Sequence, residues 1–351
     1  MKGMDRSMPA RRDALQRLEK LRGVCEGAES VCVVIYANPD PDALASAVAL
    51  KKILETADRR VTIGYTGAIG RPENASMIRQ LKIPAFPISE EEAARADIIA
   101  LVDSQPQFFE DFHLPGCDIV IDHHPFPPEQ ISAGFSDIRP NYLSTSSIMA
   151  EYLRAAGARL TRNLASALFY GIRTDSRHFM DNLSSGDIEA ITWLSRKADR
   201  DIVRQIEFSQ FSREGLDYFT IALVRRRFVK GVMFSHLGPV PFFDICVQVA
   251  DFFIRVENVS WALVSGVVGD TLVIVFRNDG MKKAAGVLAR TAFGDRGSAG
   301  GHKSMGRAQV KQDALPKGLF LTDDRGIEEY VLSSLAKISS AFRPILKSLD
   351  R

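Results

Sequence analysis

The stretch Val31-Cys32-Val33-Val34-Ile35-Tyr36-Ala37-Asn38-Pro39-Asp40-Pro41-Asp42 decides the fold of this 351-residue chain. Its first six residues are apolar without a break and rich in β-branched side chains, a pattern typical of a parallel strand covered on both faces. Residues 43–54 are rich in alanine and leucine and predict a helix. The stretch therefore opens a strand–helix unit with acidic residues at the turn.

The same alternation continues downstream and predicts an α/β domain. Consecutive strands and helices of this kind pack as a doubly wound, mainly parallel sheet with helices on both faces. Leu15, Leu18 and Leu21 recur at helical spacing and predict a helix before the first strand. The predicted strands are residues 31–36, 60–65, 98–102 and 118–121, and the further predicted helices are residues 74–81, 147–156 and 163–172.

The sequence changes character towards its C-terminal part and predicts a second, smaller domain. A chain of 351 residues is long enough for two domains with separate cores. Residues 187–211 are polar, charged and nearly free of glycine and proline, which predicts a helical connector. Strand-like runs follow at 231–236, 259–268 and 271–277, with a helix at 282–292. The predicted parts are a first domain at 1–195, a connector at 196–224 and a smaller α/β domain at 225–351.

The composition is that of an ordinary globular protein. With 46% hydrophobic and 25% charged residues, the chain lacks the bias of disordered, collagen-like or coiled-coil sequences. A net charge of +2 argues against binding to long duplex nucleic acid but leaves short anions open. There is no apolar run long enough for a membrane span and no signal-peptide core. The four cysteines form no Cys-x-x-Cys pair, so we expect a reducing, cytoplasmic environment and no membrane partner.

Acidic residues follow three of the predicted strands. Asp40 and Asp42 follow the first, Asp103 follows the strand at 98–102, and Asp122-His123-His124 follows the next. The ligand crevice of an open parallel sheet lies outside the carboxyl ends of its strands, so these groups should converge there, and Asp175 can close the ring. A single aspartate after a strand is commonly a turn former or helix cap. Capping explains only one acid of the first pair and leaves the joint pattern unexplained.

Several carboxylates in one crevice repel one another unless cations neutralise them. Carboxylates with an imidazole are the ligand set of Mn²⁺ or a similar divalent ion. Two such ions about 3.5–4 Å apart can clamp a phosphoryl group and activate water. The pattern therefore predicts metal-assisted phosphoester hydrolysis.

The most glycine-rich part of the chain lies in the predicted second domain, at residues 294–303. Gly300 and Gly301 permit close approach of the backbone to an anion, and His302 and Lys303 can donate to a phosphate. The alternative is a flexible turn before a strand at 307–310.

Taken in order, these motifs resemble those of the DHH phosphoesterase family, most closely its RecJ-like branch with nanoRNase and pAp-phosphatase members. The motifs are Asn-Pro-Asp-x-Asp at 38–42, a lone strand-end aspartate at 103, Asp-His-His at 122–124, a further aspartate at 175 and Gly-Gly-His at 300–302. The resemblance implies a catalytic DHH domain in residues 1–195 and a DHH-associated, substrate-binding domain in residues 225–351. It also implies an active site in the interdomain cleft.

The resemblance further implies a role for each matching residue. His124 would contact the scissile phosphate, and Asp103 would bridge two metal ions, so these two residues are the expected catalytic groups. The implied metal ligands are Asp40, Asp42, Asp103, His123 and Asp175. The implied substrate-binding residues are Asn38, Gly300, Gly301, His302 and Lys303.

One position departs from the family pattern. The family usually carries a metal-binding histidine two residues before Asn38, and this chain has Tyr36 there. A phenol with an ordinary pKa of about 10 is a poor replacement for imidazole. One of the two metal sites is therefore expected to be weaker or completed by water.

The function implied is that of a Mn²⁺-dependent phosphodiesterase or phosphatase, with Mg²⁺ or Co²⁺ as alternative ions. Its expected substrates are short oligoribonucleotides, pAp or related small nucleotides. The alternatives are a cyclic-dinucleotide phosphodiesterase, an exopolyphosphatase-like hydrolase, or a catalytically degenerate nucleotide-binding regulatory protein. A homodimer is compatible with these expectations.

Overall fold

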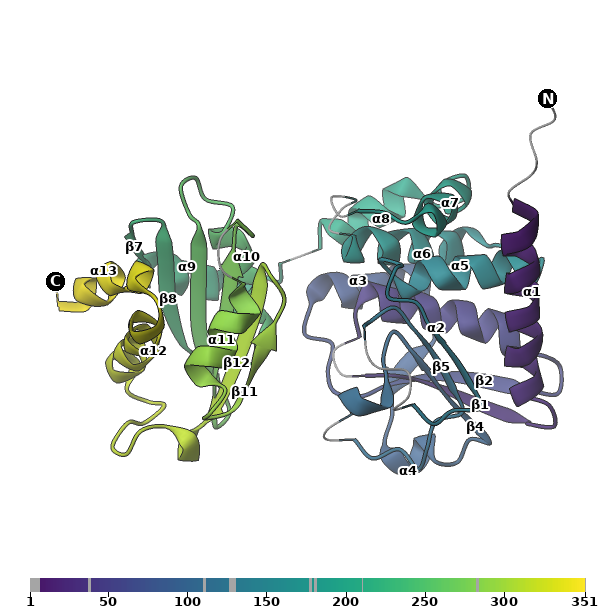
Figure 1. Ribbon diagram of the computed structural model, residues 1–351, viewed down its shortest axis with the longest axis horizontal. Helices are drawn as coiled ribbons and strands as arrows, with labels where there is room; N and C mark the ends of the chain where they lie inside the picture. Colours follow the sequence, from purple (N-terminus) through teal and green to yellow (C-terminus); the bar gives the residue numbers. More distant parts are fainter. Residues whose placement is uncertain are drawn as a thin grey trace. The chain divides into compact units, whose positions relative to one another are not determined.

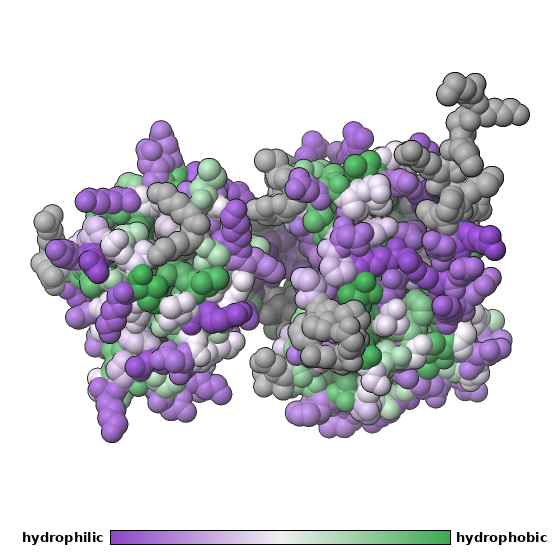
Figure 2. Space-filling model, viewed as in Figure 1, coloured by the Kyte–Doolittle hydropathy of each residue, from purple (hydrophilic) through white to green (hydrophobic). Residues whose placement is uncertain are grey.

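A computed structural model describes residues 7–36, 39–109, 112–125, 131–176, 179, 182–209, 211–281 and 284–350, with backbone alone at 7–11 and 350. The chain divides into two compact units, residues 1–210 (unit 1) and 211–351 (unit 2). Figure 2 shows hydrophilic side chains over much of the visible face of each unit, with hydrophobic ones between them. None of the described helices is long and apolar enough to cross a membrane.

Unit 1 contains a six-stranded sheet in the order β3-β2-β1-β4-β5-β6, and every neighbouring pair is parallel. This order reverses direction between β1 and β4, which is the topological switch point of a doubly wound fold. The predicted doubly wound parallel sheet is therefore confirmed. The strands are β1 (Ser30–Ile35), β2 (Arg60–Tyr65), β3 (Ala85–Pro87), β4 (Ile98–Val102), β5 (Ile119–Asp122) and β6 (Phe135–Ile138).

Helices cover both faces of this sheet, as Figure 1 shows with α2, α5 and α6 on one side and α4 on the other. The strand β1 explains the arrangement, because Val31, Val33 and Ile35 enter the larger core whereas Cys32 and Val34 enter the smaller one. Its unbroken apolar sequence thus matches burial on two faces. The helices of unit 1 are α1 (Ser7–Val24), α2 (Pro41–Leu54), α3 (Pro72–Leu81), α4 (Glu90–Ala93), α5 (Thr145–Ala155), α6 (Arg162–Asp175), α7 (Ser185–Leu194) and α8 (Arg200–Glu207).

Unit 2 contains a second six-stranded sheet in the order β11-β12-β10-β9-β8-β7, mostly antiparallel with one parallel pair, β8 and β9. One face packs against α11 and α12, and the other packs against α9 and α10. The strands are β7 (Arg227–Val229), β8 (Val232–Pro239), β9 (Trp261–Val268), β10 (Thr271–Asn278), β11 (Ser298–Gly301) and β12 (Met305–Lys311). The helices are α9 (Gly215–Arg225), α10 (Asp244–Phe253), α11 (Ala285–Phe293), α12 (Asp324–Ile338) and α13 (Arg343–Leu346).

Some elements differ from the sequence expectations. The predicted connector at 196–224 contains α8, which belongs to unit 1, and most of α9, which belongs to unit 2. The glycine-rich stretch includes the edge strand β11, where a turn or loop was expected. The strand β6 and the helices α10 and α12 were not predicted.

Candidate metal centre

Asp42 is fully buried in the first turn of α2 and accepts two backbone hydrogen bonds from α5. Its Oδ2 accepts from the amide of Thr145 at 2.6 Å, and its Oδ1 accepts from the amide of Ser146 at 2.7 Å. The start of a helix has unpaired N–H groups and a partial positive charge, so it stabilises a carboxylate. Burial nevertheless raises the pKa of Asp42, and the charge of Asp40 adds to this, against the opposing effect of His123.

Close packing at Asp42 requires a glycine on α6. A Cβ atom on Gly171 would lie 2.5 Å from Ser146 Oγ and 3.1 Å from the Cα of Asp42. Because these distances are too short for a side chain, α6 can approach α2 and α5 only with glycine here. We expect Gly171→Ala to push these helices apart at the site.

Asp103 directly follows β4 and has a left-handed backbone with φ of +54°. This conformation is uncommon for residues other than glycine, asparagine and aspartate, and it is held by neighbouring contacts. The backbone amide donates to Ile121 at 3.0 Å, and the hydroxyl of Thr145 donates to Oδ1 at 3.0 Å. The side chain is 4% exposed, and burial together with the charges of Asp42 and Asp40 raises its pKa well above the ordinary value.

His123 follows β5 and presents one unpartnered ring nitrogen to the carboxylates. Its Nδ1 lies 3.3 Å from the carbonyl oxygen of Tyr142, which can only accept, so Nδ1 carries the proton. Nε2 lies 3.4 Å from Asp103 Oδ1 and 3.3 Å from Asp175 Oδ2. It is buried and, among the described residues, has no hydrogen-bond partner. In the neutral imidazole this nitrogen therefore carries a lone pair facing two carboxylates.

Asp175 ends α6 and completes the cluster. Burial raises its pKa to about 7, with a further contribution from Asp42 and an opposing one from His123. The pKa of His123 is raised to about 9, because the contact with Asp175 and the surrounding carboxylates outweigh the lowering effect of burial. The carboxylates of the cluster thus strongly favour the positively charged form of His123. Ligand atoms of Asp42, Asp103, His123 and Asp175 all lie within 4.8 Å of one another.

Asp40 caps the helix α2, a role that the sequence pattern also predicts for one acid of this pair. Its exposed side chain caps α2, with Oδ1 accepting from the amide of Ala43 at 2.9 Å. Asp40 is not among the residues whose ligand atoms cluster, although its charge contributes to the raised pKa values of Asp42, Asp103 and Asp175. Its role as a metal ligand stays a prediction.

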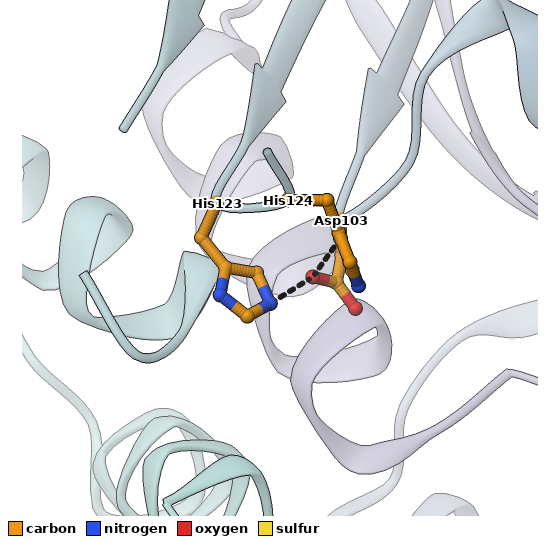
Figure 3. Close-up of side chains that lie close together, drawn as sticks. All are labelled: Asp103, His123 and His124. Carbon is orange, nitrogen blue, oxygen red and sulfur yellow. Dashed lines mark ion pairs between the residues drawn. The ribbon is translucent and has the colours of Figure 1, made fainter. Parts of the chain in front are cut away.

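His124 is held by a buried carboxylate. Its Nδ1 lies 2.9 Å from Oδ1 of Asp122, the fully buried last residue of β5, and Gln105 donates to Oδ2 of the same carboxylate at 2.6 Å. Although burial raises the pKa of Asp122, the hydrogen bonds and the charge of His124 lower it further, so it stays ionised. His124 is 38% exposed and packs edge-on against Phe108, with ring centroids 5.8 Å apart. Figure 3 shows His123 and His124 beside Asp103.

The groups that hold Asp103, His123 and His124 in position were not predicted from the sequence. Asp122 was expected only as part of a motif, and Gln105 and Thr145 were not singled out. Their function depends on contacts between strand ends that no local spacing encodes. The carbonyl of Tyr142 is a backbone group, so residue type gives no signal for it.

A buried ionic network holds the loop that carries Tyr142. The guanidinium of Arg139 donates to both carboxylate oxygens of Asp137, at N–O distances of 2.6–3.0 Å, and to Glu151 at 2.9 Å. Tyr152 donates to Asp137 at 2.6 Å, and Tyr142 donates to Glu151 at 2.8 Å. This loop leads directly into α5, whose first amides bind Asp42. The network therefore supports both the loop whose carbonyl contacts His123 and the helix whose amides bind Asp42.

Arg139→Gln should lower the free energy of unfolding by about 3 kcal/mol, because it leaves the buried carboxylate of Asp137 without its ionic partner. Arg154→Gln is the matched control, since Arg154 forms an exposed ion pair with Glu189 and should cost less than about 0.5 kcal/mol. Urea unfolding of both variants measures the difference. Equal stability of the two variants would show that the network does not support the loop.

Tyr36 directly follows β1, and its ring packs against Phe109 with centroids 4.7 Å apart. The side chain is partly buried. Neighbouring Asn38, an expected substrate-binding residue, lies outside the described residues.

The glycine-rich residues of unit 2 have a visible packing function. Gly300 and Gly301 lie in β11, and a Cβ on Gly301, whose φ is +135°, would lie 2.3 Å from the carbonyl of Met305. The carbonyls of His302 and Lys303 accept from the first amides of α11 at 2.9 Å. The side chains of His302 and Lys303 are exposed, and their role in substrate binding stays a prediction.

Comparison with known proteins identifies the family of unit 1. Residues 30–172 match the model described as "DHH family, N-terminal domain". This part of the chain belongs to the DHH family. The match includes Asp42, Asp103, His123 and His124, and it ends three residues before Asp175.

A curated relative is similar to a larger part of the chain. An uncharacterized protein of Methanocaldococcus jannaschii is 33% identical over 310 residues, which is 87% of this chain and 63% of that protein. The chain therefore spans less than two thirds of the length of this relative.

Solved structures support the fold. An exopolyphosphatase-related protein from Bacteroides fragilis has a TM-score of 0.71 at 17% identity, covering 96% of this chain and 98% of its own. A pGpG-specific phosphodiesterase from Vibrio cholerae covers 88% of this chain and 100% of its own, at 14% identity and a TM-score of only 0.37. The first similarity shows a shared fold. The second is too weak to carry an argument.

Proposed function

We propose that this chain is a divalent-metal-dependent phosphoesterase that uses Mn²⁺ and hydrolyses short oligoribonucleotides, pAp or related small nucleotides. One observation carries the proposal. Three carboxylates and the unpartnered Nε2 of His123 converge within 4.8 Å at the switch point of a DHH-family sheet. The cytoplasmic location and the homodimer remain predictions, and the proposal does not depend on them.

The residues present fit a divalent transition metal. Oxygen ligands from Asp42, Asp103 and Asp175 with one imidazole nitrogen form a donor set that suits Mn²⁺. The proton on Nδ1 of His123 is held by a backbone carbonyl, an arrangement that commonly orients metal-binding histidines. The raised pKa values of the carboxylates indicate a site that lacks compensating positive charge. A bound cation would supply it.

Divalent ions bound here would neutralise phosphate charge and lower the pKa of bound water. The side chains of the protein have separate tasks. Asp103 would help to hold the metal through its carboxylate, and Thr145 fixes its Oδ1. His124 is the expected contact of the scissile phosphate, and Asp122 fixes its ring by holding Nδ1. Because Asp122 accepts from Nδ1, the opposite nitrogen of His124 stays available to a substrate.

A hydrolysis panel tests the proposal. Metal-stripped protein with added Mn²⁺, Mg²⁺ or Co²⁺ should be assayed on a diribonucleotide, pAp, a cyclic dinucleotide and inorganic polyphosphate. We expect turnover of the diribonucleotide or pAp with Mn²⁺ and none with a chelator. Turnover restricted to the cyclic dinucleotide or polyphosphate would contradict the substrate class. No turnover with any ion would favour a nucleotide-binding protein without catalysis.

Tyr36→His should tighten Mn²⁺ binding, because an imidazole at this position adds a nitrogen ligand of the kind that transition metals favour. We expect the Mn²⁺ concentration for half-maximal activity to fall several-fold. Tyr36→Phe is the matched control, since it keeps the aromatic contact with Phe109 and adds no ligand. Titration curves that coincide for the histidine and phenylalanine variants would exclude Tyr36 from the metal site.

A further inference from the structure

We infer that unit 2 carries a binding site for one nucleotide of a single-stranded oligonucleotide, on the face of its sheet formed by β10, β12 and β11. The site is a cavity of about 390 Å³, within the size range of small-ligand sites. This inference deepens the proposed function and rests on it for the choice of nucleotide ligands. The residues concerned lie outside the Gly-Gly-His motif.

The strand register brings the lining residues to one face of the sheet. Thr271 pairs with Lys311, Val273 pairs with Gln309, and Gln309 also pairs with Ser298. Paired residues share a face, and successive residues alternate between faces. The alternate residues of β12, Ala308 and Val310, are buried in the core with α11 and α12. On the opposite face α10 packs on β9 and β10, whereas Lys311 is exposed and Gln309 is half-buried.

Basic side chains outnumber acidic ones around this cavity. Arg296 and Lys311 line the cavity, and Arg307 lies on the same face of β12. In the described part of the chain, none of the three forms an ion pair with a carboxylate, although Asp313 is also in the lining. Arg296 donates to the carbonyl of Ala314, at 3.5 Å. A phosphate group is the anion that such arginine and lysine side chains bind well.

The remaining lining fits a base and a sugar better than a bare phosphate chain. Phe243, Val268 and Val273 give the cavity an apolar wall, and Ser298 and Gln309 offer hydrogen-bonding groups. The guanidinium of Arg307 lies over the ring of Phe243 at 4.8 Å from its centroid. Unstacked bases bind to aromatic rings and to guanidinium planes. Inorganic polyphosphate has no group that would use the apolar wall.

Binding of a fluorescein-labelled, five-nucleotide oligoribonucleotide tests the inference. Anisotropy should be measured in EDTA with the full chain, so that metal-dependent hydrolysis plays no part. The double variant Arg307→Gln with Lys311→Gln should bind about tenfold more weakly, because each exposed ionic contact contributes a few-fold. The slope of log affinity against log salt should fall by about 1.4, since each lost phosphate contact on a single strand contributes about 0.7.

Matched variants separate charge from stacking. Lys337→Gln removes the same charge from an exposed position on α12, which packs on the other face, and should change affinity less than twofold. Phe243→Leu should weaken binding of the oligonucleotide about threefold and leave the affinity for inorganic polyphosphate unchanged. Equal affinities for wild type and the double variant would overturn the inference. Equal losses for oligonucleotide and polyphosphate in Phe243→Leu would overturn the nucleotide assignment.

The same variants keep this inference separate from the proposed function. Hydrolysis of a small diester such as bis-p-nitrophenyl phosphate should be unchanged in Arg307→Gln with Lys311→Gln, because that substrate is too short to need a second site. Oligonucleotide binding that depends on this pair, without any Mn²⁺-dependent hydrolysis, would reject the enzyme but keep the site. Hydrolysis by wild type with no effect of the pair on binding would reject the site but keep the enzyme.

Discussion

Asp103→Asn is expected to reduce Mn²⁺-dependent hydrolysis by about a thousandfold or more while raising the stability of the metal-free protein. The carboxylate lies 3.4 Å from His123 Nε2 and shares a site with Asp42 and Asp175. Charge stabilisation by bound metal contributes several kcal/mol to phosphoester hydrolysis, and each 1.4 kcal/mol corresponds to a factor of ten. Loss of a carboxylate from this proposed metal site should remove most of that contribution.

The gain in stability follows from the raised pKa of Asp103. A carboxylate whose pKa is raised by burial and by neighbouring acids destabilises the folded state at pH values above its ordinary pKa. Asparagine removes this charge, keeps an oxygen for the hydroxyl of Thr145, and tolerates the left-handed backbone. We therefore expect the metal-free variant to be more stable than the metal-free wild type. Alanine would lose the hydrogen bond and is a poorer test.

Thermal unfolding in EDTA and a Mn²⁺-dependent assay measure the two effects together. Asp201→Asn is the matched control, because Asp201 is an exposed residue of α8 paired with Arg204. It should change neither the rate nor the melting temperature appreciably. Wild-type activity in Asp103→Asn would remove Asp103 from the active site. A lower melting temperature would contradict the electrostatic account of the cluster.

His124→Gln should lower kcat about a hundredfold and change Mn²⁺ affinity little, because His124 is expected to stabilise charge on the phosphate. Glutamine keeps the polar character but not the imidazole. His113→Gln is the matched control, since the side chain of His113 is 86% exposed and pairs with Glu90. A hundredfold loss of Mn²⁺ affinity with unchanged kcat would instead make His124 a metal ligand.

Asp122→Asn tests whether His124 acts through a fixed orientation. The amide of asparagine cannot accept at both positions now used by His124 and Gln105, so the ring should lose its fixed tautomer. Groups that orient a functional histidine typically contribute a factor of 10 to 100, and we expect a loss of about tenfold in kcat. The double variant with His124→Gln should be no worse than His124→Gln alone. Additive losses would show that Asp122 has another function.

The position of the site could be predicted because strand ends are local features. The unbroken apolar run of β1 and the acids after β1, β4 and β5 identify the switch point without any structure. The distinction between Asp40 and Asp42 could not be predicted in the same way. Both acids are compatible with the first turn of α2, and only the packing of α5 and α6 buries Asp42 and leaves Asp40 as a cap.

Elements with weak local patterns were missed for physical reasons. The strand β6 is only four residues long and includes Asp137, which is buried because Arg139 pairs with it. The ten-residue helix α10 packs on β9 and β10 and has only three polar residues, and a short apolar run of this kind does not distinguish a buried helix from a strand. The glycines of β11 were interpreted as a loop, whereas they permit close packing against β12 and α11.

Calorimetric titration of the metal-stripped chain with Mn²⁺ tests the central claim most directly. The cluster of Asp42, Asp103, His123 and Asp175 is expected to bind Mn²⁺ saturably in wild type. The same titration should show strongly weakened binding in Asp103→Asn and unchanged binding in Asp201→Asn. A wild-type protein without saturable binding, or an Asp103→Asn variant that binds Mn²⁺ as wild type does, would contradict the account.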